Sequence, residues 1–239
     1  MPFFQLYQYL IPILLFPVAY YLWLQQAQNN HAFVLLILSM PILFAYVIPG
    51  IGTNKLHLWT FNTRFRLGNF RPHHGFVFGT ATSLLTLLVL PITSDSISGL
   101  SIIRAGFVLG SVLAFWNWLY DIVAIKTTFI QVYNRPYAAN LGPEAIATDY
   151  APMLFGVFGL CYGMAIRTCQ LVLLEQNFWD YYWLLLIICN GFTIAVPVLS
   201  FMGWSFYRYG DAGLKPFYRT QDLVDETKTL PGKNKQTLN

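Results

Sequence analysis

A stretch near the middle of the chain, residues 115–125, combines aromatic rings with an amide and a carboxylate inside an otherwise apolar segment. Asn117 and Asp121 are four residues apart, so a helix would place them on one face, and Trp116 and Tyr120 have the same spacing. A carboxylate in such a segment is costly unless it has a partner, which makes Asp121 a candidate acid or base. The alternative is an aspartate at the membrane interface that bonds a nearby basic side chain within a belt of aromatic residues.

Three arginines and two adjacent histidines lie just before the apolar segment that begins at residue 76. They are Arg64, Arg66, Arg71, His73 and His74. Guanidinium groups suit phosphate or carboxylate head groups through two-pronged hydrogen bonds, and a histidine can exchange protons near neutral pH. A purely topological role for the arginines is an equal alternative. Adjacent residues of a helix point about 100° apart, so only one histidine could readily face a given site. We therefore predict no metal site here.

A third polar stretch, residues 133–150, holds Arg135, Glu144 and Asp149. Pro143 directly before Glu144 is typical of the first turn of a short helix, where the helix dipole accounts for an acidic residue. The simplest partner for Asp149 is Arg135. This stretch nevertheless adds a guanidinium and two carboxylates to the polar groups around it, and an acid–base pair could be assembled from them.

Together these stretches predict one pocket. We expect Asp121 to meet His73 or His74 there, with these side chains as the catalytic acid or base. Arg135 would hold an anionic head group of the substrate. Four further residues are expected to contact the substrate: Asn117, Arg71, Trp116 and Tyr120.

The elements that must position these residues are apolar helices. The chain is 56% hydrophobic and 10% charged, whereas an ordinary soluble domain has roughly 25% charged residues. Six stretches are long enough to cross a bilayer, which needs roughly 17 to 25 apolar residues. They cover residues 3–24, 33–51, 76–92, 102–123, 151–174 and 181–207. The sequence predicts an all-α integral membrane protein with six transmembrane helices within residues 1–220, followed by a polar, disordered cytoplasmic tail at 221–239.

Charge predicts the orientation of these helices. All but two of the 14 lysines and arginines lie in the tail or in the connections on one side of the membrane, which follow the second and fourth predicted helices. The two exceptions are Arg104 and Arg167. Because positive charge resists translocation, the rich side is expected to be cytoplasmic, with both termini inside. The two long connections, residues 52–75 and 125–150, share that side. We expect a multi-pass protein of the plasma (inner) membrane rather than of an organelle.

Small residues predict which helices pack most closely, because membrane helices meet where side chains are small. Three of the apolar stretches carry them at helical spacing: Gly75, Gly79 and Ser83; Gly106, Gly110 and Ala114; Gly156, Gly159 and Gly163. These three helices are expected to form a tight central core. Asn190, in the last helix, is expected to make a hydrogen bond to another helix.

Three functional classes remain open. The first is a membrane enzyme that takes a lipid or isoprenoid from the bilayer and acts on its polar end at the cytoplasmic interface. The others are a non-catalytic subunit or assembly factor of a membrane complex, and a small-molecule transporter, although the internal repeat typical of transporters is missing. The expected partners are the bilayer, an amphiphilic substrate and, in the second class, other membrane subunits. The basic residues do not form a nucleic-acid surface, and no cofactor is indicated.

Overall fold

The computed structural model describes residues 2–92 and 96–220. It is 74% helical, and five of its helical stretches are long and apolar enough to cross a membrane. These stretches are Phe3–Gln26, His31–Asn54, Gly99–Lys126, Pro143–Glu175 and Trp179–Tyr209. The predicted class, an all-helical membrane protein, agrees with this architecture.

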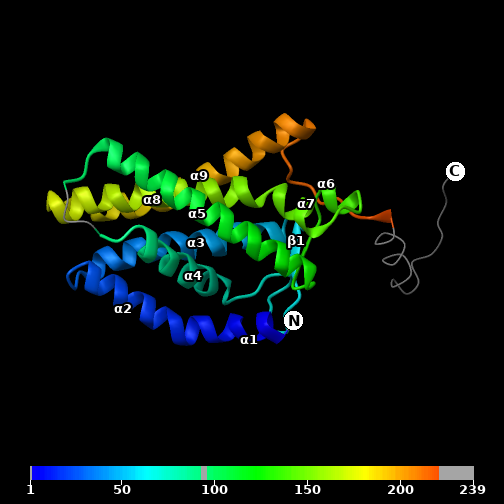
Figure 1. The fold of residues 1–239 in the computed structure, drawn as a ribbon, viewed down its shortest axis with the longest axis horizontal. Coiled ribbons are helices and arrows are strands. Elements are labelled where there is room, and N and C mark those ends of the chain that lie inside the picture. The colour runs from blue at the N-terminus through cyan, green and yellow to red at the C-terminus, as the bar shows by residue number, and fades with distance from the viewer. Residues whose placement is uncertain (1, 93–95, 221–239) are drawn as a thin grey trace.

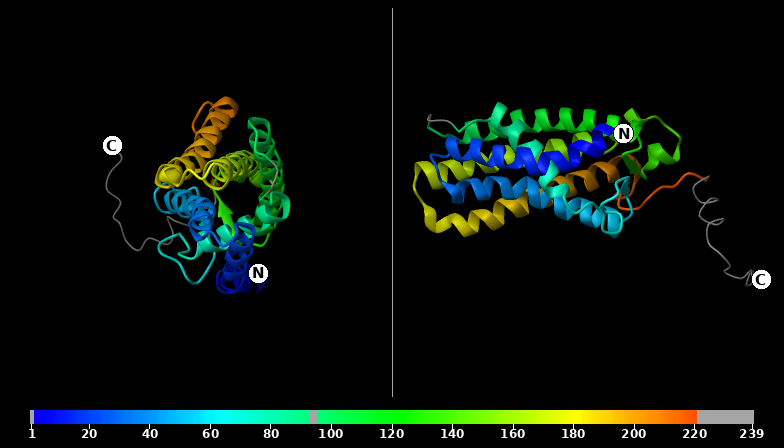
Figure 2. Two further views of the ribbon diagram at one scale, coloured as in Figure 1. Left: turned by 90° about the vertical axis from the view of Figure 1, so that its left-hand side faces the viewer. Right: turned by 90° about the horizontal axis from the view of Figure 1, so that it is seen from below.

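The helices run roughly along one axis and form a bundle (Figure 1, Figure 2). The first pass consists of α1 (Pro2–Leu10), the π-helical turn η1 (Ile11–Leu15) and α2 (Phe16–Gln26). It is followed by α3 (His31–Asn54), α4 (His74–Val89) and α5 (Gly99–Lys126). The short helices α6 (Arg135–Ala138) and α7 (Pro143–Thr148) precede α8 (Ala151–Cys169), which continues as the π-helical η2 (Gln170–Glu175). The 3₁₀ turn η3 (Trp179–Tyr181) leads into α9 (Tyr182–Tyr209).

The third predicted helix is shorter than its apolar stretch. α4 has 16 residues, which gives roughly 24 Å at about 1.5 Å per residue. A hydrocarbon core is about 30 Å thick. By length, α4 is therefore an apolar helix of the bundle that falls short of a full membrane span.

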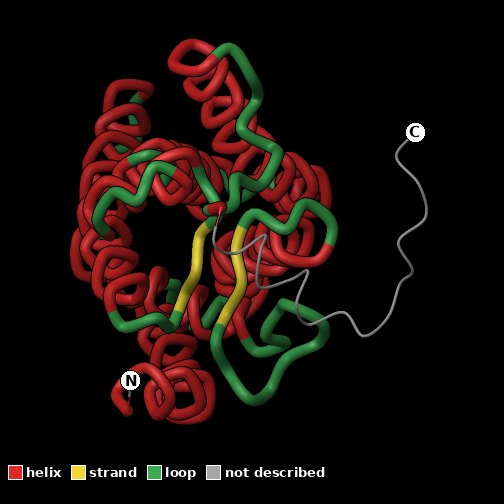
Figure 3. Tube along the Cα trace, turned by 90° about the vertical axis from the view of Figure 1, so that its right-hand side faces the viewer, coloured by secondary structure: helices red, strands yellow, loops and turns green. Residues whose placement is uncertain are grey.

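Both long connections lie at one end of the bundle and are joined by a small sheet. Figure 1 shows the N-terminus, α6 and α7 at this end, and Figure 3 shows the two strands lying across it. β1 (Trp59–Phe61) pairs antiparallel with β2 (Ile130–Val132), with Phe61 opposite Ile130. The two connections bond to each other through these strands, which satisfies backbone groups of both and anchors them.

The backbones of α5 and α8 meet at glycines. A methyl group added at Gly106 would lie 2.8 Å from the Leu160 carbonyl oxygen, and one added at Gly163 would lie 2.5 Å from that of Ala105. The predicted close packing is confirmed for these two helices. The prediction for α4 was wrong, because its Gly79 makes room for Ile42 of α3 rather than for α5 or α8. At Gly79 both the side chain and the backbone of Ile42 come close, and at Gly75 the Tyr46 ring does, so α4 packs on α3.

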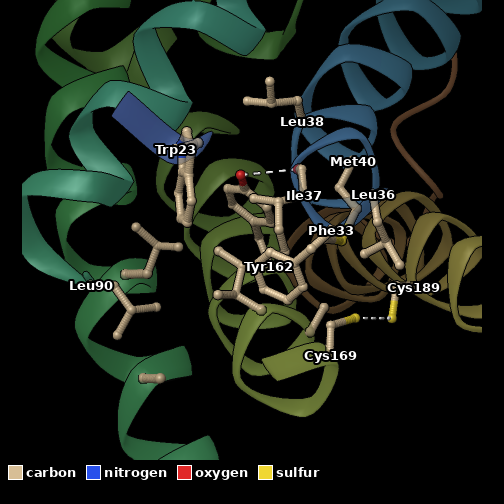
Figure 4. Packing of buried hydrophobic residues seen from close by; sticks show 14 of the residues in the cluster. Trp23, Phe33, Leu36, Ile37, Leu38, Met40, Leu90, Tyr162, Cys169 and Cys189 are labelled. Carbon is tan, nitrogen blue, oxygen red and sulfur yellow. Dashed lines mark hydrogen bonds between the residues drawn. The ribbon is translucent and has the colours of Figure 1, made fainter. Parts of the chain in front are cut away.

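Polar groups inside the bundle bond between helices. The Tyr162 hydroxyl of α8 donates to the Ile37 carbonyl oxygen of α3 at 3.2 Å (Figure 4). The Asn190 side chain of α9 donates to the Ser39 hydroxyl of α3 at 2.9 Å, which confirms the bond predicted for Asn190. Such bonds are needed because water is absent from the core of a membrane bundle.

We expect Gly110→Leu to lower the free energy of unfolding by about 3 kcal/mol or more, since the new side chain has no space. A Cβ at this position would lie 2.8 Å from the Gly156 carbonyl oxygen, and that backbone cannot move without parting α5 from α8. Gly191→Leu is the matched control, because nothing lies within 4 Å of a Cβ there. Thermal unfolding in detergent measures both variants. Equal melting temperatures would show that the α5–α8 contact does not depend on glycine.

Candidate functional site

A cavity of about 240 Å³ lies at the end of the bundle that carries the sheet. It is walled by α3, α4, α5, α8 and α9, and it is bordered by both strands and by the segment after α9. Most of its wall is apolar and aromatic, with Phe44, Ala45, Ile48, Phe78, Phe155 and Phe201 among the lining residues. An apolar cavity with a few convergent polar groups is the usual form of a small-molecule site.

Asp121 is one of three carboxylates that line this cavity, together with Asp149 and Asp211. It lies in the last two turns of α5 and is 5% exposed. The Tyr150 hydroxyl, at the start of α8, donates to its Oδ2 atom at 2.6 Å. Over residues 2–92 and 96–220, no side chain or backbone group bonds the other carboxylate oxygen. Asp121 therefore has one oxygen held by the protein and one available to a ligand.

His74, the first residue of α4, also lines the cavity. The Nε–H group of Arg71 donates to its Nδ1 atom at 2.8 Å. A ring nitrogen that accepts a hydrogen bond carries no hydrogen, so His74 is a neutral imidazole with its N–H at Nε2. No group in the described ranges accepts from that N–H. His74 can therefore donate one hydrogen bond to a ligand.

Arg71 lies behind His74 and is 1% exposed. Its guanidinium carbon lies 4.6 Å from the centre of the Phe61 ring and 5.1 Å from that of Phe129, both within the range of a cation–π contact. Its NH1 group donates to the Gln8 side chain at 3.4 Å. The first helix thus helps to hold the guanidinium that orients His74.

His73 does not line the cavity and lies on the far side of Arg71. Its Nε2 atom is 3.2 Å from the Gln8 side-chain oxygen, and the rings of Tyr9 and Phe65 pack against its ring. Burial, and second the Arg71 charge, lower the pKa of His73 to about 4. His73 is therefore a neutral structural side chain at neutral pH.

This pKa predicts how stability depends on pH. In the unfolded chain a histidine binds a proton near pH 6.5, whereas folded His73 resists protonation down to about pH 4. Acidification through this window therefore favours the unfolded chain, and stability is greatest above pH 6.5. His73→Asn should flatten the decline of the melting temperature between pH 6.5 and 4.5, whereas His57→Asn, at an exposed position, should not. If the melting temperature of the His73 variant declined as steeply as that of the parent protein, other groups would be responsible for the pH dependence.

Arg135, at the mouth of the cavity, has its charge taken up by the protein. Its guanidinium donates to the Asp211 carboxylate and lies 5.0 Å from the Tyr209 ring and 4.4 Å from the Phe217 ring. The expected pairing with Asp149 was wrong, because that carboxylate accepts hydrogen bonds from other side chains. Its donors are Arg208, Tyr209 and Asn134.

The segment after α9 supplies the carboxylate that bonds Arg135, because it folds back over the mouth of the cavity. The Phe217 N–H donates to the Tyr133 carbonyl oxygen at 2.8 Å, just beyond β2. Bonds to the Gly213 N–H and to Arg135 lower the pKa of Asp211, so this carboxylate stays charged at neutral pH. We call residues 210–219 the strap.

The cavity is lined by five of the eight predicted site residues: Asp121, His74, Arg135, Asn117 and Tyr120. Arg71 and His73 lie behind its wall, and Trp116 is 52% exposed on the outer face of α5. Whether these side chains take part in a reaction stays a prediction. Tyr150, the hydrogen-bond donor to Asp121, was missed. A buried carboxylate requires a donor, but the sequence alone does not say which of 15 tyrosines supplies it.

No group of three or more His, Cys, Asp or Glu side chains is arranged to hold a metal ion within residues 2–92 and 96–220. Comparison with protein-family models found no match to this chain, and comparisons with the curated proteins and with the solved structures found none either. Function is therefore inferred from the cavity and its side chains.

Proposed function

We propose that the chain is an integral membrane enzyme that takes a lipid or isoprenoid substrate from the bilayer and acts on its polar end at Asp121. The observation that carries this proposal is the form of the cavity, which is apolar over most of its wall and includes the bonded pair Asp121 and Tyr150 and the side chain of His74 among its polar lining residues. A long apolar chain suits the wall, and the head group would then lie beside a carboxylate.

The arrangement suits acid–base chemistry. Tyr150 fixes one oxygen of Asp121, so the carboxylate has a defined orientation, and its second oxygen can take a proton from the head group. Neutral His74 can donate a hydrogen bond to an oxygen of the same group. The aromatic wall would exclude water and strengthen these interactions.

The functional test uses the protein in vesicles made from a total lipid extract of its host membrane, supplied with the small molecules of the cytosol. Mass spectrometry before and after incubation should show one lipid consumed and another formed that differs in its polar end. Vesicles without the protein are the control. An unchanged lipid composition, from protein that retains a bound lipid, would contradict catalysis and favour a carrier.

We further propose that the cavity end of the bundle faces the cytoplasm, that both termini lie on that side, and that the host membrane is the plasma membrane. The charge distribution supports this orientation, because Arg104 and Arg167 are the exceptions among 14 basic residues. Six helical passes, with α4 as a short one, would return the chain to the side on which it began.

Cysteine labelling tests the orientation. In a background in which Cys161, Cys169 and Cys189 are replaced by alanine, we expect Asn29→Cys to react with a membrane-impermeant thiol reagent added to intact cells. Asn62→Cys should react only after the cells are opened. Both positions are exposed, so the comparison reports sidedness rather than burial. The reverse pattern would place the cavity at the outer surface.

A further inference from the structure

We propose that the head group bound beside Asp121 is an uncharged hydroxyl, so that the ligand of the cavity is a long-chain or isoprenoid alcohol. This inference rests on the proposed function and names its substrate class. Three features of the site carry it: the hydrogen-bonding groups at the polar end, the charges behind them, and the pairing of the cations at the mouth.

The hydrogen-bonding groups call for a ligand that both donates and accepts. The second oxygen of Asp121 is available as an acceptor, and the N–H group of His74 as a donor. Asn117 donates one N–H to the Leu113 carbonyl oxygen at 2.8 Å, which leaves its oxygen as a second acceptor and its other N–H as a further donor. A hydroxyl can satisfy a donor and an acceptor at once. An ammonium has no acceptor for His74, and a carboxylate or phosphate dianion has no donor for Asp121.

The buried charge behind His74 is not placed to neutralise an anionic ligand. Arg71 does not line the cavity. Its guanidinium bonds His74 and Gln8 and lies against the rings of Phe61 and Phe129. A charged head group would have to leave water for a cavity whose wall is mostly apolar, which is costly without a counter-ion in contact. An uncharged hydroxyl avoids this cost.

The cations at the mouth are not placed to draw in an anion. Arg135 bonds Asp211 and packs against two aromatic rings. Lys215 of the strap is exposed, lines the cavity as well, and acts electrostatically on Asp211. The anionic head group that we predicted for Arg135 would have to displace its carboxylate partner. A neutral head group passes the mouth without breaking this pair.

A competition among amphiphiles with one chain length tests the inference. The detergent-purified protein is mixed with equal concentrations of 1-tetradecanol, 1-methoxytetradecane, tetradecylammonium and tetradecanoate, and the bound species are counted by native mass spectrometry. We expect the alcohol adduct to exceed each of the others by at least about tenfold, because a buried hydrogen-bonding group left without its partner discriminates by that much. The ether is the closest control, since it keeps the oxygen and replaces the hydrogen that would bond Asp121 with a methyl group.

The outcomes separate the two proposals. Preferential binding of tetradecanoate or tetradecylammonium would overturn the alcohol inference while leaving a lipid-binding cavity in place. Equal binding of the alcohol and its ether would show that Asp121 does not accept from the head group, and would also overturn it. Binding of none of the four would count against the proposed function itself. In Asp121→Leu, binding of the alcohol should fall to within about twofold of binding of the ether. The competition on the parent protein decides the question even if this variant does not fold.

Discussion

Asp121→Asn should lower the rate of lipid conversion at least about a hundredfold, the usual contribution of a positioned acid or base. Asparagine keeps the size of the side chain and an oxygen that can accept from the Tyr150 hydroxyl, which lies 2.6 Å from the carboxylate. The fold should therefore be retained, with a melting temperature close to that of the parent protein. The substitution removes the charge and the capacity to exchange a proton. Conversion is measured in vesicles, and unfolding in detergent.

Asp180→Asn is the control for this substitution, because Asp180 is an exposed carboxylate of η3, which precedes α9 at the opposite end from the residues of α9 that line the cavity. It should leave both the conversion rate and the melting temperature unchanged. If Asp121→Asn instead retains parental activity, Asp121 serves as a structural partner of Tyr150. A large loss of stability in this variant would likewise favour a structural role.

Arg71→Met should destabilise the protein by about 3 kcal/mol or more, as expected when one member of a buried charge network is removed. Methionine fills much of the space but leaves the His74 Nδ1 atom without its donor. It also removes two cation–π contacts, to Phe61 and Phe129, and the hydrogen bond to Gln8. Thermal unfolding in detergent measures the effect.

Arg66→Met is the matched control, since Arg66 lies in the same connection and is exposed. It should change stability by less than about 0.5 kcal/mol. Similar stability of the two variants would contradict the role assigned to Arg71. In that case, the adjacent histidines would be held by the aromatic contacts alone.

The helices were predictable because their apolar stretches are longer than the apolar runs found in loops. Segments 33–51 and 181–207 lie within the observed α3 and within the stretch of η3 and α9. α4 ended earlier than predicted, at Val89, because an apolar run does not mark where a helix stops. The prediction of an all-helical chain missed β1 and β2. Their pairing joins residues about 70 positions apart, and three-residue strands leave no periodic pattern.

The candidate site was predictable in part for a similar reason. Asp121 and Asn117 belong to one helix, and their common face follows from their spacing. Contacts between distant segments could not be read from spacing. Tyr150 reaches Asp121 because α8 packs closely on α5, and Asp211 reaches Arg135 because the strap folds back over the mouth. The same distant contacts decided which carboxylate pairs with which arginine.

The central claim, that an apolar chain occupies the cavity, is tested most directly by native mass spectrometry of the purified protein and two tryptophan variants. Val198 lines the cavity, whereas the next residue, Leu199, is 63% exposed on the outside of α9. We predict that the parent protein and Leu199→Trp carry a lipid-sized adduct, and that Val198→Trp, which fills the cavity, carries none. An adduct that is absent from the parent protein, or equally abundant on both variants, would contradict the claim.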